Sequence, residues 1–229
     1  MAIVKKYKAE VVSVNNSIEG VYTVEFRSLD KAFRYDPGQF LHLALDAFDP
    51  AGQWPDSRCF SMQSSPNEEL IRITYAIKGS FTSQMVAELK PGIEVILKLP
   101  YGDLFTQQHA KSNNVFIAGG TGITPFLSLF THSSFALYNR PVLYAGFRNQ
   151  KMNLYANELS KAKEINPSLE WHFVYEDSNG RLNIQEIFEN SKSGSTYFIS
   201  GPPVMIKSFK DYLLQANVGQ NWILTDDWE

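Results

Sequence analysis

The sequence has little cysteine and no long hydrophobic run, and both absences exclude classes of protein. Its single cysteine, Cys59, rules out disulfides within the chain and an iron–sulfur cluster held by four of its own thiolates. No stretch approaches the roughly 20 apolar residues of a membrane helix, and the N-terminus lacks the apolar core of a secretory signal, so we expect a cytoplasmic protein. The net charge of −3 argues against a nucleic-acid-binding protein. The four histidines show no metal-ligand spacing, so we predict no metal site.

Standard phosphate-binding motifs are missing too, but a related turn is present at 115–125, which reads VFIAGGTGITP. Pro125 stands where the dinucleotide fingerprint has its third glycine, and no Gly-Lys-Ser/Thr follows as in a P-loop. A hydrophobic run that ends in such a turn brings backbone N–H groups and a helix N-terminus together, which suits a phosphate. Pro125 is compatible with the first turn of the helix. A tight turn with no ligand is the other interpretation.

A second motif lies at 58–61, which reads RCFS and precedes the strand-like segment 71–77 and the segment KGSFT at 78–82. Arg58 offers a rigid fork of donors for a phosphate. Phe60, two residues later, lies on the same strand face and can stack on a flat ring. Ser61 can hydrogen-bond a ring nitrogen. Taken alone, these are equally a surface arginine, a core phenylalanine and a turn serine.

The pattern of predicted secondary structure changes near the middle of the chain, which predicts two domains. Short segments rich in β-branched and aromatic residues in the first half predict a closed antiparallel barrel, at 8–14, 21–27, 39–45, 58–62, 70–77 and 94–99. One helix at 81–89 interrupts them. Apolar strands then alternate with helical patterns, which predicts a parallel sheet, at 115–118, 142–145, 171–175, 196–200 and 222–224. We place the domains at 1–108 and 109–229.

These motifs, in this order, resemble those of the ferredoxin–NADP(H) reductase-like flavoproteins. The resemblance covers almost the whole chain, through PGQF at 37–40, RCFS at 58–61, Gly79 with Thr82, GGTGITP at 119–125, YAGFR at 144–148 and GPPVM at 201–205. It implies an antiparallel β-barrel that binds flavin, followed by an α/β parallel-sheet domain that binds NAD(P). The expected flavin is FAD, with FMN left open because the adenine pocket has no sharp signal.

The resemblance also assigns residues to the flavin. Arg58 is expected to bind its pyrophosphate, Phe60 to pack on the ring system and Ser61 to hydrogen-bond near N5. The full expected flavin-binding set is Arg58, Cys59, Phe60, Ser61, Tyr75, Ala76, Ile77, Gly79, Ser80 and Thr82.

The expected nucleotide-binding set is Gly120, Thr121, Gly122, Thr124, Arg148, Glu176, Asp177, Gly201 and Pro202. Ser61 and Ser200 are the expected catalytic residues. Ser200 stands where the family has a cysteine, so a hydroxyl replaces a polarizable sulfur. Trp228 is a candidate for stacking on the flavin where nicotinamide must bind, with a frayed tail as the alternative.

The resemblance implies hydride transfer from NAD(P)H to FAD and electron transfer onward to a separate ferredoxin, flavodoxin or oxygenase component. Two alternatives stay open: a reductase of free flavin, and a flavin-binding subunit active only within a complex. The carboxylates of Glu176 and Asp177 favour NADH over NADPH, because they would repel a 2′-phosphate. The sequence leaves the acceptor and the oligomeric state open.

Overall fold

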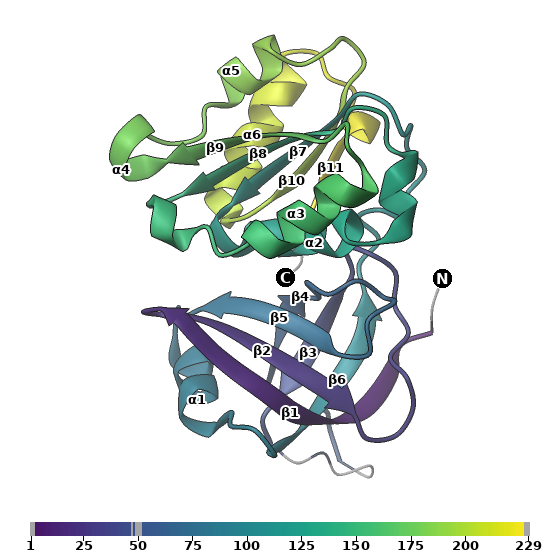
Figure 1. The fold of residues 1–229 in the computed structure, drawn as a ribbon, viewed down its shortest axis with the longest axis vertical. Helices are drawn as coiled ribbons and strands as arrows, with labels where there is room; N and C mark the ends of the chain where they lie inside the picture. Colours follow the sequence, from purple (N-terminus) through teal and green to yellow (C-terminus); the bar gives the residue numbers. More distant parts are fainter. Residues whose placement is uncertain (1–2, 47, 49–51, 227–229) are drawn as a thin grey trace.

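The computed structural model describes residues 3–46, 48 and 52–226, and it divides into two sheets (Figure 1). The first is antiparallel, with six strands in the order β4-β3-β6-β1-β2-β5. The second is parallel, with five strands in the order β11-β10-β7-β8-β9. This arrangement confirms the predicted fold class, an antiparallel domain followed by an α/β domain.

The strands of the first sheet are β1 Lys5–Ile18, β2 Val21–Ser28, β3 Phe40–Ala44, β4 Ser57–Ser61, β5 Ile71–Ala76 and β6 Glu94–Tyr101, with helix α1 Ser80–Glu88 between the last two. The second sheet holds β7 Asn114–Gly119, β8 Val142–Phe147, β9 Glu170–Tyr175, β10 Thr196–Ser200 and β11 Ile223–Thr225. Its α-helices are α2 Thr124–Phe130, α3 Ala156–Ile165, α4 Glu176–Asn179, α5 Ile184–Glu189 and α6 Pro203–Gln215. The 3₁₀ turns are η1 Gly120–Ile123, η2 Ser133–Leu137, η3 Gln150–Met152 and η4 Gln220–Trp222.

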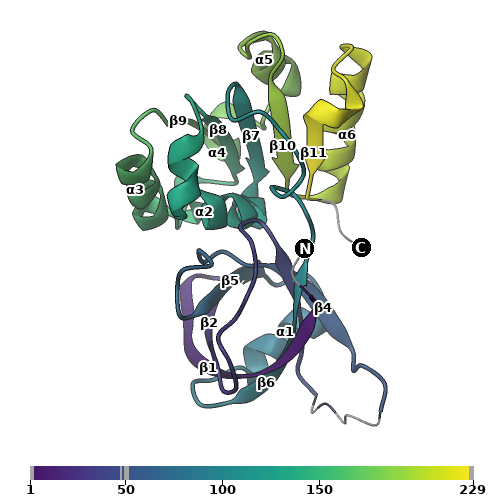
Figure 2. The same ribbon diagram turned by 90° about the vertical axis from the view of Figure 1, so that its right-hand side faces the viewer.

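Strand β1 alternates with period two, so one of its faces packs into the core of the first sheet. In β1, Tyr7, Ala9 and Val11 are buried, while Lys6 and Lys8 are exposed. Figure 2 shows the strands of this half arranged as a ring. Helix α1 packs against the same core through Phe81 and Met85.

The expected closed barrel is wrong in one respect, because the ladder of strands stops at β4 on one edge and at β5 on the other. Where a closing ladder would run, the N–H of Gln63 donates to the carbonyl of Arg72 at 2.7 Å. The N–H of Arg72 then donates to the Ser64 hydroxyl at 3.0 Å instead of to a strand carbonyl. A side chain thus satisfies an edge donor and leaves the sheet open between β4 and β5.

The second sheet is covered on both faces, which explains why its central strand is hydrophobic throughout. In β7, Phe116 and Ala118 belong to the core cluster that includes α2 and α3, whereas Val115 and Ile117 belong to the cluster that includes α5 and α6. Figure 2 shows the two pairs of helices on opposite faces.

The segment 102–113 connects the two sheets. The predicted domain boundary between residues 108 and 109 falls within it and stays a prediction. The helix expected at 81–89 is present one residue earlier. Among the residues that the structure describes, no helix has the length and apolar character needed to cross a bilayer.

Candidate functional site

Arg58 reaches from edge strand β4 to helix α1. Its guanidinium carbon lies 5.1 Å from the centre of the Phe81 ring, so the motifs at 58–61 and 79–82 are neighbours in space. Its Nη1 also bonds Oδ1 of Asp56 at 2.6 Å, in a pair whose side chains are 51% and 68% exposed. Because solvent screens such a pair, it is a weak restraint, and Arg58 is accessible to an anion at the start of α1.

Thr82 closes the turn in front of α1. Its hydroxyl accepts hydrogen bonds from the N–H groups of Lys78, at 2.9 Å, and Gly79, at 3.1 Å. It donates its proton to the Gly79 carbonyl at 3.0 Å. The hydroxyl that we expected to face a phosphate therefore stabilises the turn, and the first N–H groups of α1, which begins at the exposed Ser80, are the donors of this region.

Phe60 and Tyr75 line the barrel interior beside the opening between β4 and β5. Their rings meet edge to face, with centroids 5.9 Å apart, and Tyr75 stacks on Tyr22 at 5.6 Å. Within the described residues the buried Tyr75 hydroxyl has no hydrogen-bond partner, and burial raises its pKa to about 12. A buried hydroxyl without a partner is costly, which makes this one a candidate contact for a ligand. The neighbouring Ala76 ends β5, and Ile77 is exposed.

Cys59 points to the other face of β4 and contacts His42, with Sγ 3.4 Å from Nε2. Burial raises the pKa of its thiol. The Cys59 side chain therefore faces away from Phe60, and only its backbone lies on the path of the expected flavin-binding motif.

The glycine-rich turn after β7 is pressed against the turn after β10. A Cβ on Gly122 would lie 2.6 Å from the backbone of Gly201, and one on Gly119 would lie 2.9 Å from Pro202 and from Met205. We expected these glycines to leave room for a cofactor. At positions 119 and 122, the contact between the two turns is enough to explain why the residue is glycine.

Gly120 differs from its neighbours because its φ of +56° favours glycine and a Cβ there would meet nothing within 4 Å. The open space at this position is compatible with a bound group. Thr124 is buried, and its hydroxyl donates to the carbonyl of Thr121 at 2.9 Å, so this expected donor stabilises the turn. Pro125 lies in the first turn of α2, as the sequence predicted.

Ser61 and Ser200 meet at one carboxylate, which joins the two sheets. The Ser61 hydroxyl donates to Oδ2 of Asp226 at 3.2 Å, and the Ser200 hydroxyl donates to the same oxygen at 3.1 Å. The N–H of Asp226 donates to the Ile199 carbonyl, which anchors this segment beside β10. Sequence reasoning singled out the segment but chose Trp228, which lies outside the described residues. The sequence feature that could have identified Asp226 is its position as a carboxylate directly after the last apolar strand.

The residues expected to discriminate between NADH and NADPH lie together at the ends of β8 and β9. The N–H of Asp177 donates to the Arg148 carbonyl at 3.1 Å. Arg181 binds Oε1 of Glu176 through Nε and Nη2, both at 2.8 Å. Their side chains are 83% and 44% exposed, so this pair is also screened by solvent and is a weak restraint on Arg181.

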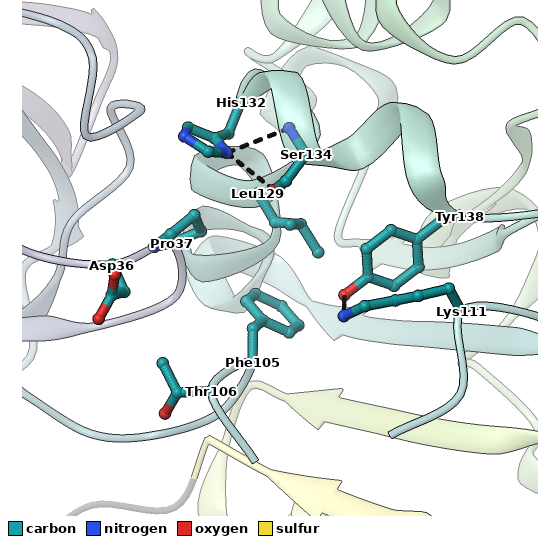
Figure 3. A pocket seen from close by; sticks show the side chains of 9 residues that line it. All are labelled: Asp36, Pro37, Phe105, Thr106, Lys111, Leu129, His132, Ser134 and Tyr138. Carbon is teal, nitrogen blue, oxygen red and sulfur yellow. Dashed lines mark hydrogen bonds between the residues drawn. The ribbon is translucent and has the colours of Figure 1, made fainter. Parts of the chain in front are cut away.

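A separate pocket of about 240 Å³ lies where the connection between the sheets meets α2 and η2 (Figure 3). Lys111 donates to the Tyr138 hydroxyl at 2.9 Å on one wall. The lining residues are Asp36, Pro37, Phe105, Thr106, Lys111, Leu129, His132, Ser134 and Tyr138. None of them belongs to the expected cofactor-binding set, so this pocket is distinct from the candidate site.

Comparisons with known proteins agree with this geometry. Residues 116–211 match the oxidoreductase NAD-binding domain family. The chain is 24% identical over 248 residues to the phenol hydroxylase P5 protein of Acinetobacter pittii, covering 98% of this chain and 66% of that protein. It is 26% identical over 232 residues to the ferredoxin–NAD(P)(+) reductase component of the naphthalene 1,2-dioxygenase system of Pseudomonas putida, covering 96% and 68%.

A similar fold occurs in the ferredoxin NADP+ reductase of Neisseria gonorrhoeae solved with bound FAD and NADP. The TM-score is 0.81 at 18% identity, with 97% of this chain and 98% of that chain covered. The chain spans about half to two thirds of the length of most curated relatives that it matches. In its two sheets, its match to the NAD-binding domain family and these relatives, the chain is similar to the ferredoxin–NADP(H) reductase-like oxidoreductases.

Proposed function

We propose that this protein is an NAD(P)H-dependent flavoprotein oxidoreductase that transfers a hydride from NAD(P)H to bound FAD. Electrons then pass to a separate acceptor protein. The observation that carries this proposal is the meeting of Ser61 and Ser200 at Asp226, because it joins the flavin motif and the nucleotide-binding turns at one point.

The residues of the barrel fit a flavin nucleotide. The exposed guanidinium of Arg58 and the N-terminus of α1 lie side by side, a donor set suited to a pyrophosphate. The unpartnered hydroxyl of Tyr75 lies in the same region of the barrel, close to Phe60. Both features are compatible with a ligand bound at the opening between β4 and β5.

The residues of the α/β domain fit the second nucleotide. Gly120 has open space beside it, at the end of β7 and before α2. This is the edge of a parallel sheet where dinucleotides bind. Gly201 and Pro202 contact the turn after β7 and would hold the nicotinamide end of the dinucleotide.

The chemistry of hydride acceptance comes from the flavin, which can take two electrons and release them singly or in pairs. The chain's own residues bind and orient. Arg58 and the start of α1 would hold the pyrophosphate, Ser61 would lie at the ring edge with its oxygen as an acceptor, and Ser200 would line the nicotinamide pocket. Asp226 accepts a hydrogen bond from each hydroxyl and so orients both serines. Orientation is the main contribution, since reacting atoms must approach within about 3–3.5 Å.

We propose NADH as the preferred donor. The carboxylates of Glu176 and Asp177, which begin α4 directly after β9, support this choice because they would repel a 2′-phosphate. A ribose with free hydroxyls can donate hydrogen bonds to the same carboxylates.

We propose an oxygenase component or a ferredoxin as the acceptor. The similarity to the reductase component of the naphthalene dioxygenase system supports this class. The proposed location is the cytoplasm.

An absorbance spectrum of the purified protein followed by anaerobic titration tests the proposal. We expect a bound flavin spectrum that bleaches with one equivalent of NADH. A protein that purifies without flavin yet oxidises NADH when free flavin is added would be a free-flavin reductase. Bound flavin that NADH does not reduce would indicate a subunit active only within a complex.

A further inference from the structure

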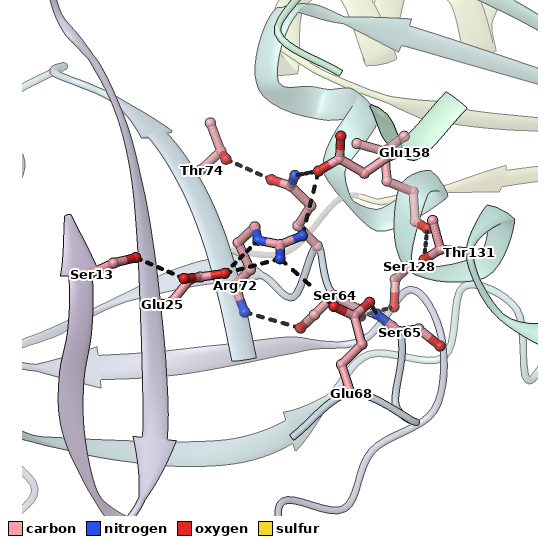
Figure 4. Close-up of polar contacts among 12 residues, drawn as sticks. Ser13, Glu25, Ser64, Ser65, Glu68, Arg72, Thr74, Ser128, Thr131 and Glu158 are labelled. Carbon is pink, nitrogen blue, oxygen red and sulfur yellow. Dashed lines mark hydrogen bonds and ion pairs between the residues drawn. The ribbon is translucent and has the colours of Figure 1, made fainter. Parts of the chain in front are cut away.

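Two hydrogen bonds connect the α/β domain with the segment that follows the flavin motif. Nε2 of Gln63 donates to Oε1 of Glu158 on α3 at 2.8 Å. The Ser128 hydroxyl on α2 donates to the Ser64 carbonyl at 2.8 Å. We call these four residues the junction; Figure 4 shows Glu158 and Ser128 approaching the barrel from the other domain.

Three of the four junction residues are buried, and the Glu158 side chain is 18% exposed. Gln63 is 3% exposed, Ser64 1% and Ser128 0%. The Gln63 amide is held at both ends, because its Oε1 accepts from the Thr74 hydroxyl at 2.6 Å within the barrel. Breaking either contact would leave a buried polar group without a partner, which is costly. The junction is therefore a rigid connection.

Arg72 strengthens the connection from the barrel side. Its Nη1 lies 3.4 Å from Oε1 of Glu158, the oxygen that accepts from Gln63. Its Nε and Nη2 bind Oε1 of Glu25, at 3.1 and 2.9 Å (Figure 4). Glu25 holds the arginine within the barrel, whereas Glu158 draws it toward the other domain. Glu68 also lies 3.7 Å from Nη2 of Arg72, so three carboxylates surround this arginine, and of the three only Glu158 belongs to the α/β domain.

The junction lies next to both halves of the candidate site. Gln63 follows Ser61 by two residues along the chain that leaves β4. Ser128 belongs to α2, which begins directly after the turn Gly120–Ile123. The junction is thus adjacent along the chain to the flavin motif on one side and to the nucleotide-binding turn on the other.

We propose that Gln63 and Glu158 are positioning residues, which set how closely the nicotinamide pocket approaches the flavin motif. This inference rests on the proposed hydride transfer. It predicts that loss of the Glu158 carboxylate slows flavin reduction while nucleotide binding, made by other residues, is retained. A misplacement of about 1 Å can cost on the order of a hundredfold in rate.

The test compares Glu158→Ala with Glu158→Gln and Glu25→Ala in the flavin-loaded protein. Glu158→Gln keeps an acceptor oxygen for Gln63 and serves as the conservative variant. Glu25→Ala removes a carboxylate from the same Arg72 and leaves both hydrogen bonds of the junction in place. Stopped-flow flavin reduction at saturating NADH gives the rate, and hydrogen exchange of backbone amides at 61–64 reports the junction without any turnover.

We expect Glu158→Ala to reduce the rate by about tenfold or more with an NADH dissociation constant within about twofold of wild type. Amide exchange at 61–64 should become faster. Glu158→Gln should recover most of the rate, and Glu25→Ala should leave both measurements near wild type even where it lowers the melting temperature.

Equal rates and equal exchange in Glu158→Ala and Glu25→Ala would overturn the inference. A wild-type protein whose flavin NADH does not reduce would instead contradict the proposed function. In that case the exchange measurement still decides whether Glu158 holds the 61–64 segment.

Discussion

The two halves of the candidate site are built in opposite ways. The barrel half depends on side chains, since Arg58 reaches α1 and the Thr82 hydroxyl closes the turn before it. The α/β half depends on missing side chains, since Gly122 and Gly201 allow two turns to touch through their backbones. Removal of a side chain should weaken the first half gradually, whereas addition of one carbon should disrupt the second.

The largest effect is expected from Gly122→Ala. Its Cβ would lie 2.6 Å from the Gly201 backbone, which has no flexible end to give way. We expect a loss of about 1–3 kcal/mol in the free energy of unfolding and loss of measurable NADH binding. Urea denaturation and a binding titration check both.

Gly120→Ala is the matched control for stability, because its Cβ meets no protein atom within 4 Å and only its positive φ resists the substitution. It should cost about 1–2 kcal/mol. If the two alanine variants were equally stable, contact between the turns would not be the reason for Gly122.

Arg58→Ala should have the next largest effect. Loss of a charge-assisted contact to a phosphate costs about 1.5–3 kcal/mol, or roughly 10- to 150-fold in the flavin dissociation constant. Asp56→Asn is the control, since it frees Arg58 from its exposed ion pair and should keep or tighten flavin binding. Unchanged flavin affinity in the alanine variant would remove Arg58 from the site.

A smaller effect is expected from replacing Glu176 with Ser and Asp177 with Arg together. The change removes two carboxylates, one of them the partner of Arg181, and adds a cation at the end of β9. We expect the ratio of kcat/KM for NADH over NADPH to fall about tenfold, equivalent to about 1.4 kcal/mol. Steady-state kinetics with both nucleotides measure this. A wild-type enzyme that already prefers NADPH would contradict the assignment.

Ser200→Cys should have the smallest effect. A thiol is a weaker donor to Asp226 than a hydroxyl, but its sulfur is more polarizable. We expect flavin reduction to become about two- to threefold faster at an unchanged NADH affinity, a barrier change below about 1 kcal/mol. A slower rate, seen by stopped-flow at saturating NADH, would mean that the hydrogen bond to Asp226 matters more than the sulfur.

Most of the fold followed from local patterns. The short strands of the first half and the alternation of apolar strands with helices in the second half both follow from residues close in sequence, and both were predicted. The open edge of the first sheet was not predicted, because it depends on the Ser64 hydroxyl replacing a strand carbonyl for Arg72. Side-chain substitutions of this kind leave no periodic signal.

The site was predicted less completely, for two reasons. Thr82 and Thr124 carry hydroxyls that serve their own turns, and the Gly-x-x-Thr spacing at 79–82 is itself a cap signal that could have indicated this. Asp226 and Glu158 join segments far apart in sequence, so only the folded arrangement brings them to Ser61 and Gln63. The roles that the sequence assigned to the flavin-binding, nucleotide-binding and catalytic residues stay predictions.

Anaerobic titration of the purified protein with NADH is the most direct test of the central claim, that the two halves meet to pass a hydride. We predict that the bound flavin absorbance bleaches at one equivalent of NADH, at a rate that Glu158→Ala lowers and Glu25→Ala does not. A protein that binds both flavin and NADH but shows no bleaching would contradict the account.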